Sequence, residues 1–310
     1  MAVVLFKSQT DDPTLWNTEL SRYLAHLDFR VWPDVGDPQE VEFLLIWGEL
    51  GDLLETLPNV KVILSLGAGV DHLGDLNKIQ DNISVIRLVD DDLTRGMSEY
   101  VIFNVLRFHR LDQLYREQQS QRIWQEHPPV ASSEIRVGVM GLGILGKDAA
   151  KKLSSLDYNV LGWCREPKSF DFCSVFHGKE GLNDFLEQTN ILICLLPLTA
   201  ETDGILCAKT FSKLPVNSYL VNAGRGQHLI NADLLDALSS GQLLGAAIDV
   251  FQEEPLSTSH PFWGNTKIMM TPHVASKTNY KTAAKCIARN INNWERGGNL
   301  EGVVNSSRGY

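Results

Sequence analysis

No stretch of the sequence is apolar for long enough to cross a membrane. A membrane-spanning helix needs ~20 consecutive apolar residues, and no run among the 310 residues approaches that length. The first residues, Met1 to Phe6, have no basic region before their apolar run, so they do not resemble a secretory signal peptide. We therefore expect a protein without a membrane partner.

Cysteine is scarce and shows no paired spacing. Five cysteines are present, and none belongs to a C-x-x-C pair: Cys164, Cys173, Cys194, Cys207 and Cys286. An odd count without paired spacing argues against a disulfide framework and against a zinc site, and it fits a reducing compartment. The sequence thus predicts a cytoplasmic protein that binds no metal.

Positive charge is in deficit. The chain has 28 Lys and Arg against 38 Asp and Glu, a formal net charge of −10, which disfavours nucleic acid and anionic membranes as partners. An anionic substrate would therefore need a local basic site. The sequence has neither internal repeats nor low-complexity segments, and its 44% hydrophobic residues and its length suit two globular domains.

Apolar strand-like runs and helical patterns alternate through most of the chain. The expected strands or short apolar runs are Val3–Phe6, Phe29–Trp32, Phe43–Trp47, Val60–Leu66, Val85–Leu88, Ile135–Met140, Asn159–Trp163, Ile191–Leu196, Tyr219–Asn222, Leu244–Val250 and Ile268–Thr271. The expected helices are Pro13–Leu27, Lys147–Leu156, Asn231–Leu238 and Thr278–Trp294, with Asn231 as an N-cap and Gly241 ending that region. Strands that alternate with helices predict parallel sheets covered on both faces.

One long segment departs from this alternation. Ser98–Gln119 has the apolar spacing of a single long helix, and Arg122–Ser133, which contains Trp124, has the composition of a loop. An arm of this kind is a candidate for docking on a second subunit.

The stretch from Ile135 to Arg165 predicts a dinucleotide site. The G-x-G-x-x-G motif Gly141-Leu142-Gly143-Ile144-Leu145-Gly146 lies between an expected strand and an expected helix. Gly141 permits the tight turn, Gly143 lets a pyrophosphate approach the backbone, and Gly146 lets the helix pack close to the strand. The helix N-terminus then favours the phosphates. The alternative is a glycine turn with only a structural role.

The end of the second strand of this unit indicates which cofactor binds. An NAD site usually has Asp or Glu there, but this sequence has Cys164, followed by Arg165 and then Lys168. A guanidinium suits the 2′-phosphate of NADP, so we predict that NADPH is preferred over NADH. In the alternative, these charges are solvated and Glu166 takes the role of the acid.

Three candidate catalytic residues lie just past expected strand ends, where ligands bind in such sheets. His273 is a candidate general acid, because an imidazole titrates near ~6.5. Glu254 is the candidate partner that orients it, with Glu253 as its nearest rival, and Arg225 is placed to bind a carboxylate. The alternatives are a structural histidine, solvated loop acids and a structural arginine. A second glycine turn, Gly67-Ala68-Gly69, is a candidate anion-binding nest, and the alternative is a turn with only a structural role.

These motifs together resemble the D-2-hydroxyacid dehydrogenase family over nearly the whole chain. The segments that carry the resemblance are the glycine motif, Leu195–Thr199, Leu220–Gly226, Gly245–Phe251 with Glu254-Pro255-Leu256, and Thr271-Pro272-His273. Within the family, Leu66–Asp71, Trp47 and the terminal Arg308-Gly309-Tyr310 look most like the glyoxylate/hydroxypyruvate reductase A branch, which favours NADPH.

The resemblance implies two doubly wound α/β domains with parallel sheets and a cleft between them. Residues 1–97 with 281–310 would form a flavodoxin-like substrate domain, and residues 98–280 an NADP(H)-binding Rossmann domain. The chain would act as a homodimer on a small 2-oxo acid. NADPH would supply hydride, His273 a proton, Glu254 would support His273, and Arg225 would hold the carboxylate. Glyoxylate would become glycolate, and hydroxypyruvate D-glycerate.

The resemblance also implies the contacts of each ligand. The expected cofactor-binding residues are Gly141, Leu142, Gly143, Ile144, Leu145, Gly146, Cys164, Arg165, Lys168, Leu196, Pro197, Thr202, Ala223 and Asp249. The expected substrate-binding residues are Trp47, Ala68, Gly69, Arg225, His273 and Ser276. The sequence offers no account of His228, which stands where the family usually has an apolar residue. Two alternative functions remain: the same chemistry on a bulkier 2-oxo acid, and a nucleotide-sensing regulatory protein on the same fold.

Overall fold

The computed structural model describes residues 2–305 and divides the chain into two compact units. Unit 1 comprises Met1–Leu93 and Thr278–Tyr310, and unit 2 comprises Thr94–Lys277. The two division points lie a few residues before the expected ones. The terminal Arg308-Gly309-Tyr310 lies outside the described residues.

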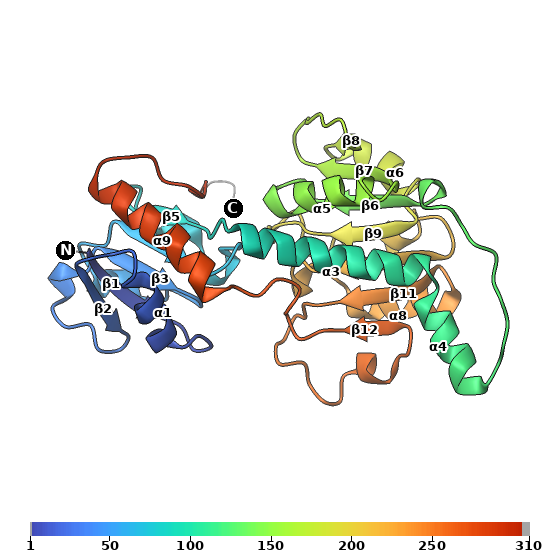
Figure 1. Cartoon of the computed structure of the whole chain (residues 1–310), viewed down its shortest axis with the longest axis horizontal. Coiled ribbons are helices and arrows are strands. Elements are labelled where there is room, and N and C mark those ends of the chain that lie inside the picture. Colours follow the sequence, from blue (N-terminus) through green and yellow to red (C-terminus); the bar gives the residue numbers. More distant parts are fainter. Residues whose placement is uncertain (1, 306–310) are drawn as a thin grey trace. The chain divides into compact units, whose positions relative to one another are not determined.

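Unit 1 is built on a five-stranded parallel sheet in the order β2-β1-β3-β4-β5 (Figure 1). Its strands are β1 (Ala2–Lys7), β2 (Leu27–Val31), β3 (Phe43–Ile46), β4 (Val62–Ser65) and β5 (Ser84–Ile86). This order is that of a flavodoxin-like doubly wound sheet. Strands β1, β3 and β4 are apolar on both faces, as expected for strands that are covered on both sides.

Helices α1 (Pro13–Leu20), α2 (Leu53–Thr56) and α9 (Tyr280–Glu295) belong to unit 1. Helix α1 begins where the Asp12 side chain accepts the Thr14 N–H, and α9 begins where Asn279 accepts the Lys281 N–H. The two helices pack together, with Trp16 edge-to-face against Tyr280 at 5.2 Å between ring centroids. The last helix of the chain therefore completes the first unit.

Unit 2 is built on a seven-stranded parallel sheet in the order β12-β11-β10-β9-β6-β7-β8. Its strands are β6 (Arg136–Met140), β7 (Asn159–Cys164), β8 (Ser174–His177), β9 (Ile191–Cys194), β10 (Ser218–Asn222), β11 (Leu243–Ile248) and β12 (Ile268–Met270). The chain order reverses between β6 and β9, so the switch point of a Rossmann sheet lies beside the glycine motif. Two doubly wound parallel α/β units confirm the predicted fold class.

Helices cover both faces of this sheet. Between α2 and α9 the chain forms the helices α3 (Asp91–His109), α4 (Asp112–Gln121), α5 (Ile144–Ser154), α6 (Glu180–Leu186), α7 (Ala208–Phe211) and α8 (Asn231–Ser240). The short 3₁₀ helices of the chain are Pro38–Glu40, Asp71–Leu73, Leu76–Lys78, Ser132–Glu134, Gly226–His228 and Pro261–Gly264. Side chains of α3 and α5 pack on one face, and those of α6, α7 and α8 on the other.

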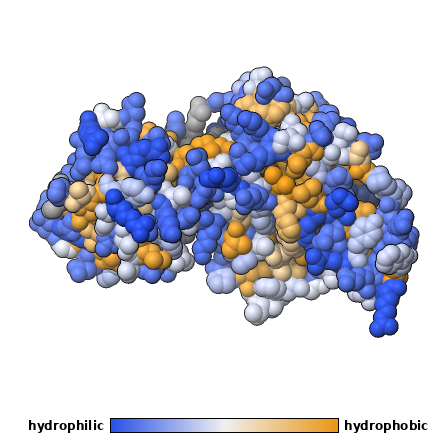
Figure 2. Space-filling view, viewed as in Figure 1, coloured by the Kyte–Doolittle hydropathy of each residue, from blue (hydrophilic) through white to orange (hydrophobic). Residues whose placement is uncertain are grey.

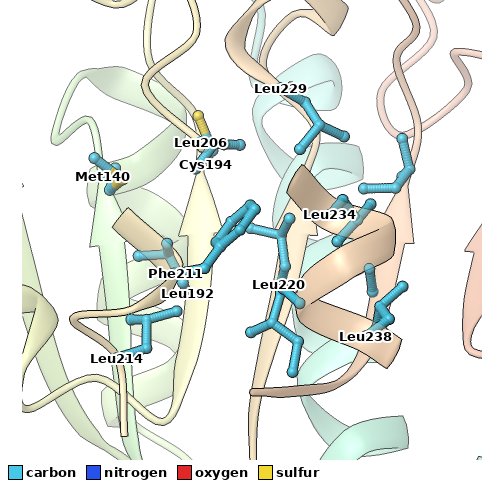
Figure 3. Packing of buried hydrophobic residues seen from close by; sticks show 14 of the residues in the cluster. Met140, Leu192, Cys194, Leu206, Phe211, Leu214, Leu220, Leu229, Leu234 and Leu238 are labelled. Atoms are coloured by element: carbon cyan, nitrogen blue, oxygen red, sulfur yellow. The ribbon is translucent and has the colours of Figure 1, made fainter. Parts of the chain in front are cut away.

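Successive side chains along the strands of unit 2 point to opposite faces of the sheet, and they contribute to two hydrophobic cores, one on each face. On β9, Ile191 and Ile193 join the core under α3 and α5, while Leu192 and Cys194 join the opposite core. Figure 3 shows the second core, where Phe211 meets leucines of β9 and β10, with leucines of α8 beside them. Each fully buried Leu or Phe contributes roughly 1.5–3 kcal/mol to stability.

The expected single helix over Ser98–Gln119 is wrong. The structure has two helices, α3 and α4, separated by a break at Leu111, which takes a left-handed conformation with φ of 55°. Apolar spacing continues through the break, so the pattern alone did not show it. Helix α4 and the segment to Ala131 project from the rest of unit 2 (Figure 1).

Two further expectations are corrected. The first helix ends at Leu20 instead of Leu27, because Leu27 already belongs to β2. Asn231 is not an N-cap: it is the first residue of α8, Ile230 precedes it, and its side chain contacts His260 instead. Gly241 does end this helix, in a left-handed conformation with φ of 80°.

Hydrophilic residues cover most of the face shown in Figure 2, and hydrophobic residues gather there in separate patches. Within residues 2–305, no helix is both long and apolar enough to span a membrane.

Candidate functional site

Six parallel strands of unit 2 end beside one another, and each carries predicted site residues at its carboxyl end. In sheet order these are His273 after β12, Asp249 after β11, Ala223 and Arg225 after β10, Leu196 and Pro197 after β9, the glycine loop after β6, and Cys164 with Arg165 at the end of β7. Because all pairings are parallel, these ends form one edge of the sheet. The sequence spreads these residues over more than 130 positions.

The glycine loop joins β6 to α5, and each glycine has a visible reason. Gly141 has φ of 98°, and a Cβ there would lie 2.6 Å from the carbonyl oxygen of Leu195. A Cβ on Gly146 would lie 1.8 Å from the carbonyl oxygen of Gly141, so only glycine lets α5 approach the loop this closely. A Cβ on Gly143 would meet nothing within 4 Å. The loop therefore leaves open space at the N-terminus of α5, between the two constrained glycines.

The end of β7 is tied to this loop. Lys168 Nζ donates to the carbonyl oxygen of Leu142 at 2.9 Å, and Cys164 Sγ donates to the carbonyl oxygen of Glu166 at 3.1 Å. Burial raises the pKa of the Cys164 thiol, so it stays neutral. Arg165 pairs with Glu201 at 3.3 Å. Lys168 thus adds positive charge beside the glycine loop, whereas the charge of Arg165 is paired with Glu201.

The loop after β9 is held by one hydroxyl. Thr202 Oγ1 donates to the carbonyl oxygen of Pro197 at 2.7 Å and accepts the N–H of Thr199 at 2.9 Å. Thr202 is buried and holds the shape of this loop, and its contact with the cofactor stays a prediction.

Asp249 shapes the turn that carries His273. Its buried carboxylate accepts the N–H groups of Val274 and Ala275, each at 2.9 Å, and the Thr271 hydroxyl at 2.6 Å. His273 N–H donates to the Asp249 carbonyl oxygen at 2.8 Å. His273 adopts φ of 52°, a conformation that few non-glycine residues take, and these contacts hold it there.

A tyrosine that the sequence analysis passed over extends this network. Tyr100 of α3 lies 2.9 Å from Thr271 Oγ1. Because Thr271 gives its own proton to Asp249, the Tyr100 hydroxyl is the donor in this contact. Burial raises the pKa of Tyr100 to about 12, so it keeps that proton. No sequence pattern distinguishes Tyr100 from the other apolar-face residues of α3.

His273 and Glu254 form the predicted pair. His273 Nδ1 lies 2.8 Å from Glu254 Oε2, and the N–H of Phe251 donates to Glu254 Oε1 at 2.9 Å. Burial alone would raise the pKa of Glu254, but these two hydrogen bonds and the positive charges of His273 and Arg225 outweigh it and hold the pKa below its ordinary value of 4.5. Glu253, the rival, is exposed like Glu254, so the hydrogen bonds of Glu254 and not its burial distinguish the two. Among the described residues none hydrogen-bonds His273 Nε2.

The Arg225 loop is packed tightly against its neighbours. Arg225 Nη1 donates to the carbonyl oxygen of Gly224 at 2.8 Å, and Asn222 Nδ2 donates to the carbonyl oxygen of Arg225 at 3.1 Å. A Cβ on Gly226 would lie 1.9 Å from the backbone carbon of Phe251. The loop that carries Arg225 is thereby fitted to the turn that carries Glu254, and the charge of Arg225 acts on the Glu254 carboxylate.

In unit 1 the glycine turn after β4 is organised by Ser65 and His72, which the sequence analysis did not single out. Ser65 Oγ accepts the N–H of Gly67 at 3.2 Å and lies 3.0 Å from His72 Nε2. Within residues 2–305 no acceptor binds the N–H groups of Ala68 and Gly69, which suits an anion nest.

Trp47, the residue after β3, packs against His72 with 4.1 Å between ring centroids and the two ring planes tilted by 43°. A Cβ on Gly67 would lie 2.6 Å from the indole, so glycine is needed beside Trp47. In unit 2, Ser276 lies against Gly96 of α3, where an added Cβ would be 3.2 Å from Ser276 Oγ. His72 directly follows the motif Leu66–Asp71, and this position is the sequence signal that could have indicated its contacts with Ser65 and Trp47.

A model of the family described as "D-isomer specific 2-hydroxyacid dehydrogenase, NAD binding domain" matches residues 102–275. This chain belongs to the D-isomer specific 2-hydroxyacid dehydrogenase family. The resemblance drawn from its motifs is thereby confirmed.

Named relatives point to one branch of this family. Glyoxylate/hydroxypyruvate reductase A of Yersinia enterocolitica is 37% identical over 300 residues, covering 95% of this chain and 96% of the relative. A family member from Xanthobacter autotrophicus Py2, solved with NADPH and MES, has a TM-score of 0.94 and 36% identity, covering 100% of this chain and 99% of that one. An NADPH-dependent glyoxylate/hydroxypyruvate reductase from Sinorhizobium meliloti, solved with NADP and sulfate, has a TM-score of 0.93 and 33% identity over 100% of both chains.

Proposed function

We propose that this dehydrogenase uses NADPH to reduce small 2-oxo acids, glyoxylate to glycolate and hydroxypyruvate to D-glycerate. The observation that carries the proposal is the His273–Glu254 pair at 2.8 Å, under the charge of Arg225, at the same sheet edge as an open glycine loop. The names of the relatives supply the substrates.

The residues at the glycine loop fit a phosphorylated dinucleotide. The space in front of Gly143, which an added side chain would begin to fill, lies at the N-terminus of α5, where backbone N–H groups and the helix dipole favour phosphate. Arg165 and Lys168 stand where an acid would bind the unphosphorylated ribose, and they suit a 2′-phosphate instead. The proposed cofactor contacts are Gly141–Gly146, Cys164, Arg165, Lys168, Leu196, Pro197, Thr202, Ala223 and Asp249.

NADPH supplies the hydride when it is bound. Arg225 binds the substrate carboxylate and draws electron density from the adjacent carbonyl. His273 donates the proton on Nε2 to the carbonyl oxygen, while Glu254 fixes the ring through Nδ1 and stabilises its charged form. We assign further substrate contacts to Trp47 and the N–H groups of Ala68 and Gly69 in unit 1, and to Ser276 in unit 2.

Initial rates of NADPH oxidation with glyoxylate, hydroxypyruvate, pyruvate and phenylpyruvate, repeated with NADH, test this function. We expect turnover of the two small substrates with NADPH, at least tenfold lower kcat/KM with NADH, and loss of turnover in His273→Ala with NADPH binding kept. Turnover of a bulkier acid alone would keep the chemistry and overturn the substrate assignment. NADPH binding without any turnover would favour the regulatory alternative.

We further propose that the enzyme is a cytoplasmic homodimer. All five cysteines are free thiols, which supports a reducing compartment. The projecting arm, defined as α4 with the segment Arg122–Ala131, supports self-association because it exposes large apolar side chains, Trp124 at 97% and Val130 at 50%.

A further inference from the structure

His228 is fully buried next to the Arg225 loop, and the mechanism above makes no use of it. Its imidazole contacts two loops at once. Nδ1 accepts the backbone N–H of Arg225 at 3.0 Å, and Nε2 lies 3.3 Å from the carbonyl oxygen of Pro197. These two loops follow β10 and β9, which are adjacent strands.

The partners dictate the protonation of the ring. A backbone N–H can only donate, so Nδ1 carries no proton, and a carbonyl oxygen can only accept, so Nε2 carries one. Cys194 Sγ, 3.7 Å from Nδ1, agrees with this arrangement. Burial raises the pKa of Cys194 to about 12, so the thiol keeps its proton and can only be a donor toward Nδ1. The imidazole is therefore neutral, with one acceptor and one donor nitrogen.

Close packing leaves the ring little freedom. A Cβ on Gly224 would lie 2.8 Å from His228 Nδ1, so the backbone just before Arg225 rests on the ring. At the other nitrogen, Pro197 has a second anchor, because Thr202 also donates to its carbonyl oxygen at 2.7 Å. The Pro197 carbonyl oxygen would therefore keep one hydrogen bond if the contact with His228 Nε2 were lost.

We propose that His228 is a positioning residue for substrate binding: its Nδ1 holds the Arg225 backbone in the conformation that presents the guanidinium to the substrate carboxylate. An apolar residue of similar size would fill the same space but could not accept the Arg225 N–H, so this part-buried hydrogen bond would be lost. The inference depends on the proposed role of Arg225.

Three substitutions separate the two nitrogens. His228→Asn keeps an acceptor near the position of Nδ1, His228→Gln keeps a donor near Nε2, and His228→Leu keeps neither. We expect the KM for glyoxylate to rise about tenfold in the Gln and Leu variants and less than about threefold in the Asn variant. The Kd for NADPH is expected to change less than about threefold in all three, whereas kcat should fall in the Gln and Leu variants, because a displaced Arg225 also polarises the substrate carbonyl less.

Thermal unfolding of each variant identifies any that fail to fold. If the Leu variant fails to fold, the comparison of the Asn and Gln variants still tests the proposal. If His228 had only a general structural role, its substitution would raise the KM and the NADPH Kd together, or would raise the KM equally in the Asn and Gln variants. Either result overturns the proposal. Arg225→Gln is measured in the same assay. If it leaves the KM unchanged, the role of Arg225 is wrong; if it raises the KM but His228→Gln does not, the inference about His228 alone is wrong.

Discussion

The carboxylate of Glu254 forms one hydrogen bond with His273, and this bond helps to lower the pKa of Glu254. Its pKa lies below the ordinary 4.5, so the ionised group stabilises the folded state. For a depressed pKa, this stabilisation is present above the ordinary value and is lost as the pH falls through the folded-state pKa. The side chain is 35% exposed, so solvent screens part of the effect.

Glu254→Gln should therefore lower the stability near neutral pH, and this difference should shrink below pH 4.5 and disappear once the pH has fallen through the lower folded-state pKa of Glu254. Urea unfolding of wild type and variant at several pH values measures the difference directly. Glu253→Gln, one residue away and exposed, is the matched control and should show no such dependence. A difference between wild type and Glu254→Gln that stays constant across the range would show that the hydrogen bond to His273 does not set the ionisation.

At the scale of elements, two glycines of the glycine loop are needed for different reasons: Gly146 for close packing and Gly143 for access of the cofactor. An alanine Cβ at Gly146 would lie 1.8 Å from a backbone oxygen, which cannot move cheaply, whereas at Gly143 it would meet nothing. Gly146→Ala should lower the free energy of unfolding by about 2–3 kcal/mol. Gly143→Ala should leave stability within about 0.5 kcal/mol but weaken NADPH binding about tenfold, because its methyl group would lie where the phosphates approach.

Urea unfolding and fluorescence titration with NADPH, each on both variants, distinguish the two roles. If Gly143→Ala binds NADPH as tightly as wild type, the pyrophosphate does not approach the backbone there.

The elements that the sequence predicted best are the central strands, since burial on both faces makes them continuous apolar runs. Strand β8 (Ser174–His177) was missed because it lies at the sheet edge and is only half buried, so its composition is mixed. The break at Leu111 was missed because a leucine fits the apolar face of a helix in either case.

Candidate site residues were predictable where a motif places them at a strand end, as for Arg225 and His273. Roles that arise from contacts across the sheet were not. Asp249, which stays a predicted cofactor contact, also accepts backbone N–H groups more than twenty positions away, and no local pattern indicated this role. The contacts of His228 with Arg225 and Pro197 likewise depend on the adjacency of β9 and β10, which no local pattern encodes.

At the scale of the whole molecule, the arm exposes neighbouring large apolar side chains. Trp124 is 97% exposed, and Ile123 beside it is 46% exposed, so both side chains leave apolar area in water. Burial of this area against a second copy of the chain would offset the cost of association at ~25 cal/mol per Å² of apolar surface. The arm has little core of its own, since Gln118 is the one buried residue within α4.

We expect the wild-type chain of 34.6 kDa to elute with about twice that mass in size-exclusion chromatography with light scattering. The double substitution Ile123→Asp and Trp124→Asp should shift it to the monomer, because two desolvated carboxylates would have to be buried at the interface. Trp263→Ser is the matched control: it removes a tryptophan that is 58% exposed elsewhere in unit 2 and should leave the mass unchanged. A wild-type monomer would refute the dimer, whereas a dimer that survives the double substitution would place the interface away from the arm.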